Sequence, residues 1–324
     1  MKSYAIIGTG ALGGYYGGLL AKSGCDVHFL MRSDASHVRQ HGLRVDSVNG
    51  NFQLPHVQAY SSTAEMPPCD CVIIALKSTQ NASLAEILPP LLHSNSYAIV
   101  LQNGLHVEAE AENILGKGRI LGGCCFLCSN KVGPGHIRHL DYGTILLGSY
   151  LGLDGCSRSV PNEVIQEIVH DFSLATIPIE VTDNLQNARW KKLMWNIPFN
   201  GLSVILNAST DAIMNHPDSR ALVDGIMRDV RQAAMACGET IPEEHIARMI
   251  DHTEQMVPYD SSMRLDFLAG RPMEIDSIFS NPSRAAQAAG YAATFIEVLQ
   301  KQLQFLDRNA SRSSRNNVAD QRLP

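Results

Sequence analysis

The sequence predicts an α/β protein in two parts: a mostly parallel sheet with helices, followed by an all-helical domain. Up to Val181, short apolar runs alternate with amphipathic segments, which is typical of parallel strands joined by crossover helices. Strand-like patterns then almost disappear, and segments with helical periodicity follow. We expect a first domain over residues 1–183, a helical domain over 184–307 and a disordered polar tail over 308–324.

A glycine-rich turn directly follows the first apolar run, residues 4–7. The turn consists of Gly8, Thr9, Gly10, Ala11, Leu12 and Gly13. A strand that passes through G-x-G-x-x-G into a helix is the fingerprint of a Rossmann-type dinucleotide-binding domain. Gly8 permits the tight turn, Gly10 lets a pyrophosphate approach the backbone, and Gly13 allows the helix to pack on the sheet. The phosphates would lie at the helix N-terminus, where free N–H groups favour an anion. The alternative is a glycine-rich turn without a ligand.

The end of the second strand predicts which dinucleotide is bound. After a helix over 11–23, the second strand over 26–30 leads to Arg32, and no acid comes between the end of this strand and Asp34. An acid at this place binds the ribose 2′-hydroxyl of NAD, whereas an arginine suits the 2′-phosphate of NADP. We therefore predict NADP(H) as the cofactor. The alternative is that Arg32 is a solvated residue at a strand end.

Two further strands lead to polar side chains. The buried run 71–76 is followed by Lys77, and the run 97–101 is followed by Asn103. Ligands of open α/β sheets bind in the crevice outside the carboxyl ends of parallel strands. We therefore expect both side chains to face the cofactor.

Turn signals and periodicity assign the rest of the first domain. Helices are expected over 81–92 and 162–175. Two β patterns lie between them, at 119–127 and 137–147. Gly133-Pro134-Gly135 marks the turn between these patterns, and Tyr142-Gly143 reads as another turn.

The helix that opens the second domain carries a polar stripe. At about 100° per residue, Lys192, Asn196, Asn200, Ser203 and Asn207 share one narrow face with apolar borders. Such a stripe is buried, and buried polar groups need partners. A polar ligand would supply them, and an interhelical polar network is the alternative. A desolvated lysine has a lowered pKa and can act as a general acid near neutral pH.

A second polar set follows in the helical domain. Ser262 precedes a helical run, so it reads as an N-cap and as part of an anion site for a substrate carboxylate. Glu274 comes later, and an acid beside a buried lysine would tune that lysine and could hold a hydroxyl. Plain capping by Ser262 and a helix-start carboxylate at Glu274 are the alternatives.

Composition argues against several classes of protein. The net charge of −6 without a long basic block speaks against nucleic-acid binding and a polybasic membrane anchor. No apolar run approaches the ~20 residues that a membrane helix needs. Eight irregularly spaced cysteines indicate reduced thiols and a cytoplasmic protein. The cluster Cys124, Cys125 and Cys128 lacks a second ligand pair, so we predict buried small hydrophobes and no metal. Apolar faces of the helical domain would allow a homodimer.

Together these motifs resemble the ketopantoate reductase (2-dehydropantoate 2-reductase) family over the chain up to about Asp307. The landmarks are G-x-G-A-x-G at 8–13, Lys77, Q-N-G at 102–104, W-x-K-L-x-x-N-x-x-x-N at 190–200, S-S-M at 261–263 and E-I-D at 274–276. The resemblance implies an oxidoreductase that reduces the 2-oxo group of ketopantoate with NADPH. The product, pantoate, serves pantothenate and coenzyme A synthesis.

The resemblance also implies roles for individual residues. It makes Lys192 the proton donor to the carbonyl oxygen, and it puts Glu274 near the substrate hydroxyl and the nicotinamide ribose. Asn103 would contact both cofactor and substrate. The substrate would be held by Asn196, Asn200 and Ser262, and the phosphate and ribose side of NADP by Arg32 and Lys77.

The chain departs from the family pattern at several places. Pro198 lies inside the catalytic helix and predicts a kink there, whereas the family proline more often follows the second Asn. Ile278-Phe279-Ser280-Asn281-Pro282 stands where many members have I-N-G. Two other functions stay open: reduction of another 2-oxo acid or an opine-type imine, and a non-catalytic NADP-binding sensor.

Overall fold

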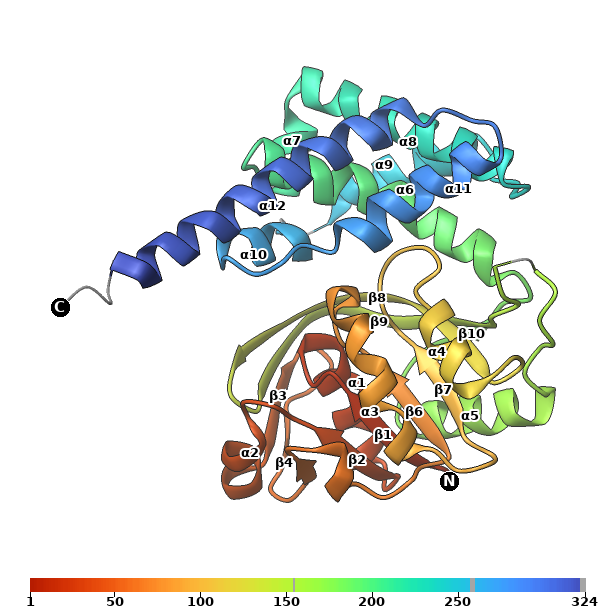
Figure 1. Ribbon diagram of the computed structural model, residues 1–324, viewed down its shortest axis with the longest axis vertical. Helices are drawn as coiled ribbons and strands as arrows, with labels where there is room; N and C mark the ends of the chain where they lie inside the picture. Colours follow the sequence, from red (N-terminus) through yellow and green to blue (C-terminus); the bar gives the residue numbers. More distant parts are fainter. Residues whose placement is uncertain (154, 257–259, 321–324) are drawn as a thin grey trace. The chain divides into compact units, whose positions relative to one another are not determined.

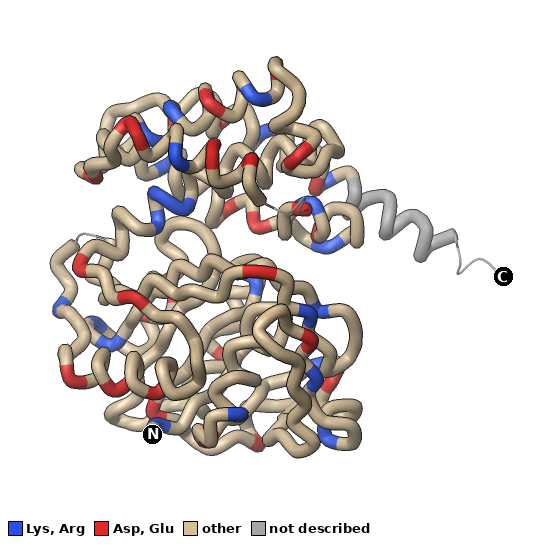
Figure 2. Tube along the Cα trace, turned by 180° about the vertical axis from the view of Figure 1, so that it is seen from behind, with Lys and Arg blue, Asp and Glu red and all other residues tan. Residues whose placement is uncertain are grey.

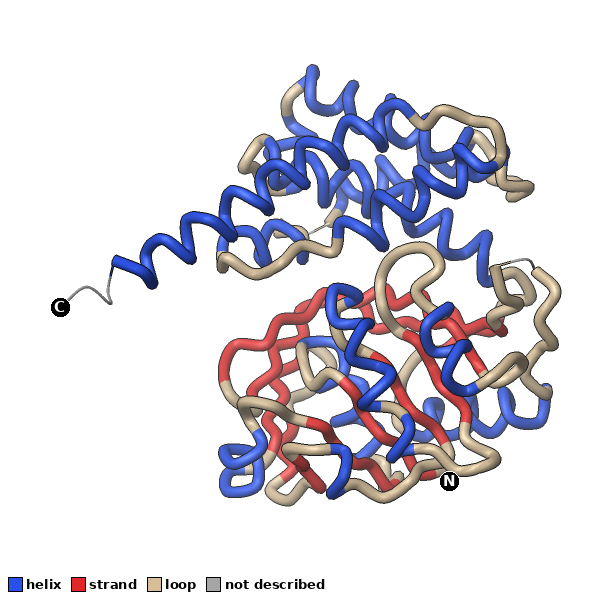
Figure 3. The backbone as a smooth tube through the Cα atoms, in the orientation of Figure 1, coloured by secondary structure: helices blue, strands red, loops and turns tan. Residues whose placement is uncertain are grey.

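The protein is described from a computed structural model that covers residues 1–153, 155–256 and 260–320, with side chains up to Asn309. The chain divides into two compact units, Met1–Leu185 and Gln186–Pro324. The sequence places this boundary after Asp183. All strands of the described residues belong to the first unit (Figure 3).

The described part of the first unit contains one ten-stranded sheet (Figure 1). Its order is β4-β3-β9-β8-β7-β6-β1-β2-β5, and β10 pairs with β9. All pairs are parallel except β3–β4 and β8–β9. The predicted α/β class with a mostly parallel sheet is therefore confirmed. The strands are β1 (Ser3–Ile7), β2 (Asp26–Leu30), β3 (Leu43–Ser47), β4 (Phe52–Leu54), β5 (Gln58–Tyr60), β6 (Cys71–Ile74), β7 (Tyr97–Val100), β8 (Ile120–Gly133), β9 (His136–Ser149) and β10 (Ile179–Val181).

One helix of the first unit differs from its prediction. The continuous helix expected over 81–92 is divided into two 3₁₀ turns and one short α-helix. Pro89 and Pro90 have no N–H, so they cannot continue the hydrogen-bond ladder of an α-helix. The helical elements of this unit are α1 (Ala11–Lys22), α2 (Ala35–His41), η1 (Thr63–Glu65), η2 (Ser78–Ser83), α3 (Leu84–Ile87), η3 (Pro89–Leu91), α4 (Ala109–Leu115) and α5 (Asn162–Leu174).

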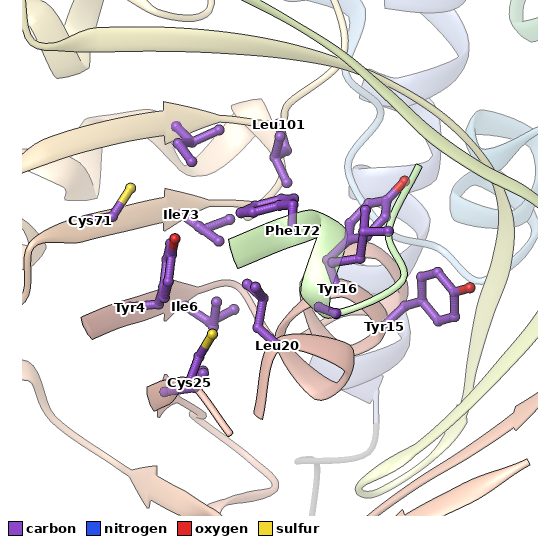
Figure 4. Packing of buried hydrophobic residues seen from close by; sticks show 14 of the residues in the cluster. Tyr4, Ile6, Tyr15, Tyr16, Leu20, Cys25, Cys71, Ile73, Leu101 and Phe172 are labelled. Atoms are coloured by element: carbon purple, nitrogen blue, oxygen red, sulfur yellow. The ribbon is translucent and has the colours of Figure 1, made fainter. Parts of the chain in front are cut away.

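Strand β1 lies in the hydrophobic core of the first unit, where side chains pack against both of its faces. Tyr4 and Ile6 are fully buried, together with Tyr16 and Leu20 of α1 (Figure 4). Phe172 of α5 packs edge-on against Tyr4, with ring centroids 6.1 Å apart. Successive residues of a strand point to opposite faces, and Ala5 and Ile7 on the other face are also fully buried, so both faces of β1 are packed. The turn that follows β1 therefore starts from a rigid element.

The antiparallel pair β8–β9 contains a β-bulge where the sequence suggests a turn. The chain does turn at Gly133-Pro134-Gly135, but Tyr142-Gly143 lies inside β9, so the expected second turn is wrong. Phe126 pairs with Thr144 and Leu127 with Tyr142, which leaves Gly143 as the extra residue of the bulge. Its φ of +136° requires glycine, and a bulge uses this freedom as readily as a turn does.

Every element in the described part of the second unit is helical, as the sequence predicts. Where one helical segment is expected over 274–307, the structure has three elements: a π-helical turn, a helix that directly follows it, and a last helix that is separated from the second element at Gly290 (φ +83°). The elements are α6 (Leu185–Ile205), α7 (Thr210–Asn215), α8 (Pro217–Ala236), α9 (Glu244–Gln255), α10 (Ser262–Leu268), the π-helical turn η4 (Asp276–Ser280), α11 (Asn281–Ala288) and α12 (Thr294–Asp320).

The helix α12 extends beyond the expected end of the helical domain. It continues to Asp320, through residues for which the sequence suggests a disordered tail. The stretch 292–323 contains neither Gly nor Pro, so its residues lack the two types that stop a helix most strongly. The last part of the predicted tail, residues 321–324, lies outside the described residues.

Charged residues of both signs are interspersed along the trace of both units (Figure 2). This distribution accompanies a net charge of −6. Among the described residues, no helix is both long and apolar enough to cross a membrane. The clustered thiols of Cys124, Cys125 and Cys128 are all buried, as expected for small core side chains.

Candidate active site

The predicted cofactor residues of the first unit follow four adjacent parallel strands. The strands β7, β6, β1 and β2 are neighbours in that order, and their pairing is in register up to their last residues. Asn103, Lys77, Gly8 and Arg32 come after the carboxyl ends of these four strands, respectively. The topology therefore brings them to one edge of the sheet, where ligands of open α/β sheets bind.

The structure explains the presence of glycine differently at the three glycine positions of the turn. Gly8 has φ +95°, and a Cβ there would lie 2.3 Å from the backbone nitrogen of Leu76. A Cβ on Gly13 would lie 2.3 Å from the carbonyl oxygen of Gly8. A Cβ on Gly10 would meet no atom within 4 Å. The fold itself thus requires Gly8 and Gly13, whereas Gly10 borders open space of the kind that a pyrophosphate needs.

Side-chain hydrogen bonds fasten the strand ends around this turn. The hydroxyl of Thr9 donates to the carbonyl oxygen of Leu30 over 2.8 Å, which ties the turn to β2. The buried amide of Gln102 donates to the carbonyl oxygen of Leu76 over 2.9 Å, which ties the end of β7 to the end of β6. Ala11 and Leu12 begin α1, so their backbone N–H groups have no acceptor one turn earlier in the helix. The turn is therefore a preorganised place for an anion.

Arg32 has a partner that the sequence did not reveal. Its guanidinium donates to the side-chain oxygen of Gln80 over 2.6 Å. Gln80 belongs to η2, which begins directly after Lys77. The segment K-S-T-Q at 77–80 therefore supplies two polar residues to the same edge of the sheet, of which only the lysine was anticipated.

Asp34, the first acid after β2, is already engaged within the protein. Its carboxylate forms an ion pair with Lys131 over 2.6 Å and accepts hydrogen bonds from Gly135 N–H (3.0 Å) and the Ser33 hydroxyl (2.7 Å). Burial alone would raise the pKa of Asp34, but these partners together hold the pKa below its usual value. A carboxylate occupied in this way is not available to a ribose 2′-hydroxyl.

The polar stripe of α6 is present, with one correction. Asn196, Asn200 and Ser203 are buried, with 6%, 2% and 0% of their surface exposed, and Lys192 is partly buried. The helix passes through Pro198 without interruption and ends at Ile205. Asn207 therefore lies beyond the helix and is exposed, and its positive φ of 49° is a conformation that Asn tolerates at a helix end. Its assignment to the stripe was wrong.

Two members of the stripe differ in their hydrogen bonds. The hydroxyl of Ser203 lies 2.7 Å from that of Ser261, so Ser203 belongs to an interhelical polar network. The side-chain oxygen of Asn200 is buried and has no hydrogen-bond partner among the described residues. An unsatisfied buried acceptor costs free energy unless a ligand or water completes it. Asn200 is thus the member of the stripe that most directly indicates a ligand.

The N-cap of α10 is Ser261, whereas the sequence suggested Ser262. The Ser261 hydroxyl accepts from Arg264 N–H over 3.1 Å, and Ser262 is the first residue of the helix. Two adjacent serines satisfy the same capping pattern, so the sequence alone could not choose between them. Glu274 is 4% exposed and lies just before the π-helical turn η4. Such turns are frequent at functional sites.

These features define a class of protein. A Rossmann-type unit with a glycine turn, followed by a helical unit in which a partly buried lysine shares a helix face with buried amides, is the two-part organisation of a dinucleotide-dependent oxidoreductase. Residues 4–152 match the family described as "Ketopantoate reductase PanE/ApbA", and residues 184–307 match its C-terminal domain. The chain belongs to the ketopantoate reductase family, and it is an oxidoreductase of this type.

Individual relatives span nearly the whole chain. This chain is 50% identical over 306 residues to a 2-dehydropantoate 2-reductase of a Nostoc species, and the match covers 94% of this chain and 95% of the relative. Its structure is similar to that of 2-dehydropantoate 2-reductase from Geobacter metallireducens, with a TM-score of 0.89 and 40% identity over 95% and 99% of the two chains. The enzyme from Methylococcus capsulatus gives a TM-score of 0.84 with 30% identity over 95% and 98%.

Proposed function

We propose that this chain reduces ketopantoate to pantoate with NADPH in the cytoplasm, and so supplies pantothenate and coenzyme A synthesis. The observation that carries the proposal is the stripe on α6, in which Lys192 lies on the same helix face as Asn196 and the unsatisfied side-chain oxygen of Asn200. The name of the Nostoc relative, at 50% identity, supports the choice of substrate.

The residues of the second unit have distinct roles in this proposal. NADPH, when bound, supplies the hydride that reduces the 2-oxo carbon. Lys192 donates a proton to the substrate oxygen, and its charge stabilises the negative charge that develops there. Asn196 and Asn200 hydrogen-bond the substrate, and Ser262 holds its carboxylate. Glu274 accepts hydrogen bonds from the substrate hydroxyl and from the nicotinamide ribose.

The residues of the first unit bind the cofactor in this proposal. The turn at residues 8–13 holds the pyrophosphate, and the open space beside Gly10 supports this role. Arg32 and Lys77 hold the 2′-phosphate and ribose side, and Asn103 contacts both cofactor and substrate. The engagement of Asp34 with Lys131 supports NADP over NAD, because no free acid remains at the end of β2 for the ribose hydroxyl.

The proposal is tested by following NADPH oxidation with ketopantoate, and then with a panel of other 2-oxo acids in the presence and absence of amines. The highest kcat/KM is expected for ketopantoate. A higher value for another 2-oxo acid, or turnover that requires an amine, would instead favour the related reductase or the opine-type enzyme. Cofactor binding without turnover on the whole panel would favour the sensor.

Replacing Arg32 with alanine is expected to raise KM for NADPH by about tenfold or more, because a charge-assisted contact to the 2′-phosphate is lost. KM for NADH should stay nearly unchanged, since NADH lacks this phosphate. Arg39→Ala is the matched control, because Arg39 contacts the carbonyl oxygen of Ala59 and the carboxylate of Glu65. An equal loss with both cofactors in Arg32→Ala would contradict the role of Arg32.

We also propose that the chain forms a homodimer through α12. Phe295, Val298 and Phe305 lie on one face of this helix and are 42%, 49% and 66% exposed. Exposed apolar side chains that share a helix face are typical of contacts between copies. Val298→Asp with Phe305→Asp is expected to convert a dimer to a monomer in light scattering after gel filtration. Leu174→Asp, on α5, is the control, and a monomeric parent protein would contradict the proposal.

A further inference from the structure

Two serine hydroxyls meet in the interior of the second unit. Ser203 lies in the last turn of α6 and Ser261 caps α10, and both are fully buried. Their oxygens are 2.7 Å apart although the residues are separated by 58 positions. We call these two residues the hydroxyl pair. None of the proposed roles in substrate or cofactor binding uses it.

The hydroxyl pair lies between the first turn of α10 and the backbone of Asn200. Arg264 N–H donates to the Ser261 oxygen over 3.1 Å, and the Ser203 hydroxyl lies 3.3 Å from the carbonyl oxygen of Asn200, which can accept its proton. Between Ser203 and Ser261, either hydroxyl can be the donor. The result is a chain of polar contacts from the first turn of α10 to the backbone of Asn200.

The chain of polar contacts ends at Asn200, whose side-chain oxygen is not held by a hydrogen bond within the described part of the protein. Asn200 is 2% exposed, and its side-chain oxygen has no hydrogen-bond partner among the described residues. Its orientation toward a ligand must therefore come from its backbone and from packing. At the other end, Ser261 directly precedes Ser262, the residue proposed to hold the substrate carboxylate.

A second contact joins the segment directly after α6 to α10, outside the hydroxyl pair. The guanidinium of Arg264 donates to the carbonyl oxygen and the side-chain oxygen of Asn207, over 3.4 and 3.2 Å. It also forms an ion pair with Asp260. The end of α6 and the start of α10 are thus joined on the surface as well as in the interior.

We propose that Ser203 and Ser261 are positioning residues that fix Asn200 relative to Ser262, and thereby set the affinity for the 2-oxo acid. This inference rests on the proposed function, because it assumes that Asn200 and Ser262 hold the substrate. Neither hydroxyl touches the reacting atoms. Both act by keeping two substrate contacts at a constant separation, which is what binding in a single orientation requires.

The test separates KM for ketopantoate from the other kinetic constants. Ser203→Ala is expected to raise KM for ketopantoate about tenfold, the effect of one lost hydrogen bond, with kcat and KM for NADPH changed less than about twofold. Ser219→Ala is the matched control. Its hydroxyl is also buried and donates to the carbonyl oxygen of Ile213 over 2.6 Å, with the carbonyl oxygen of His216 3.2 Å away, and both lie away from the hydroxyl pair.

A second variant tests the pair from its other side. Ser261→Ala should also raise KM for ketopantoate, and adding Ser203→Ala to it should raise KM little further, because the two hydroxyls act as a unit. Full additivity of the two changes would overturn the inference. So would a KM in Ser203→Ala no higher than in Ser219→Ala, or a parallel change in kcat and in KM for NADPH.

Amide hydrogen exchange supplies a readout that does not depend on turnover. Ser203→Ala should speed exchange at Arg264 and the rest of the first turn of α10, and Ser219→Ala should not. A parent protein that reduces no 2-oxo acid would refute the proposed function, and the exchange result would still decide whether the pair couples the helices. A parent that reduces ketopantoate, with unchanged exchange in Ser203→Ala, would refute the coupling alone.

Discussion

Replacing Lys192 with alanine is expected to lower kcat for ketopantoate reduction by about 10³-fold or more. A general acid in proton transfer contributes on the order of 10²–10⁴-fold, and the lysine charge also stabilises the oxygen that becomes an alkoxide. The measurement is the single-turnover rate of NADPH oxidation at saturating substrate. NADPH affinity, followed by fluorescence titration, should stay close to that of the parent.

Lys191 provides the matched control for this variant. It is the adjacent lysine on α6 and is also partly buried, but it points about 100° away around the helix. Lys191→Ala should keep kcat within a few-fold of the parent. Near-parent turnover in Lys192→Ala would refute the assignment of Lys192 as the proton donor, whatever the result for Lys191.

Replacing Gly10 with valine is expected to weaken NADPH binding by about 100-fold while the first unit stays folded. A Cβ at this position would meet no protein atom within 4 Å, and the backbone there (φ −82°, ψ −156°) is extended with a negative φ. The valine would instead occupy the space through which a pyrophosphate approaches the backbone. Titration calorimetry with NADPH, together with the melting temperature, checks both parts of this prediction.

Gly8→Ala is expected to show the opposite pattern. Its Cβ would lie 2.3 Å from the backbone nitrogen of Leu76, and φ is +95°, so the melting temperature should fall markedly. If Gly10→Val binds NADPH as tightly as the parent, the glycine-rich turn is only a structural turn. The pair of variants thus separates the two explanations of the fingerprint that the sequence left open.

The parts of the fold with strong periodicity could be predicted from the sequence. The strands β1, β6 and β7 are almost entirely apolar and are buried on both faces as such runs predict, whereas β2 also contains Asp26 and His28. Parallel topology then gathers the polar residues that follow them, so Arg32, Lys77 and Asn103 could be placed at one edge without coordinates. The stripe on α6 could also be predicted, because helical periodicity is a local property of the sequence.

Features that depend on distant partners could not be predicted. Gly143 allows either a turn or a bulge, and only its pairing with β8 decides between them. Ser261 and Ser262 are equivalent as caps until the first turn of α10 is fixed. The contact of Gln80 with Arg32 joins residues 48 positions apart, and nothing in either local sequence indicates it. Tertiary context, rather than propensity, made each of these choices.

The parallel pairing of β3 with β9 determines when the sheet can be completed during synthesis. The contact of Ser47 with His139 joins residues 92 positions apart, so β3 has only β4 beside it until β9 leaves the ribosome. At typical translation rates this open edge lasts roughly 5 to 20 s, and an isolated two-stranded hairpin is marginal. The sheet is complete when β10 joins β9, just before α6 emerges. A nascent chain can therefore complete the sheet of its first unit before the helix that carries the proposed proton donor has left the ribosome.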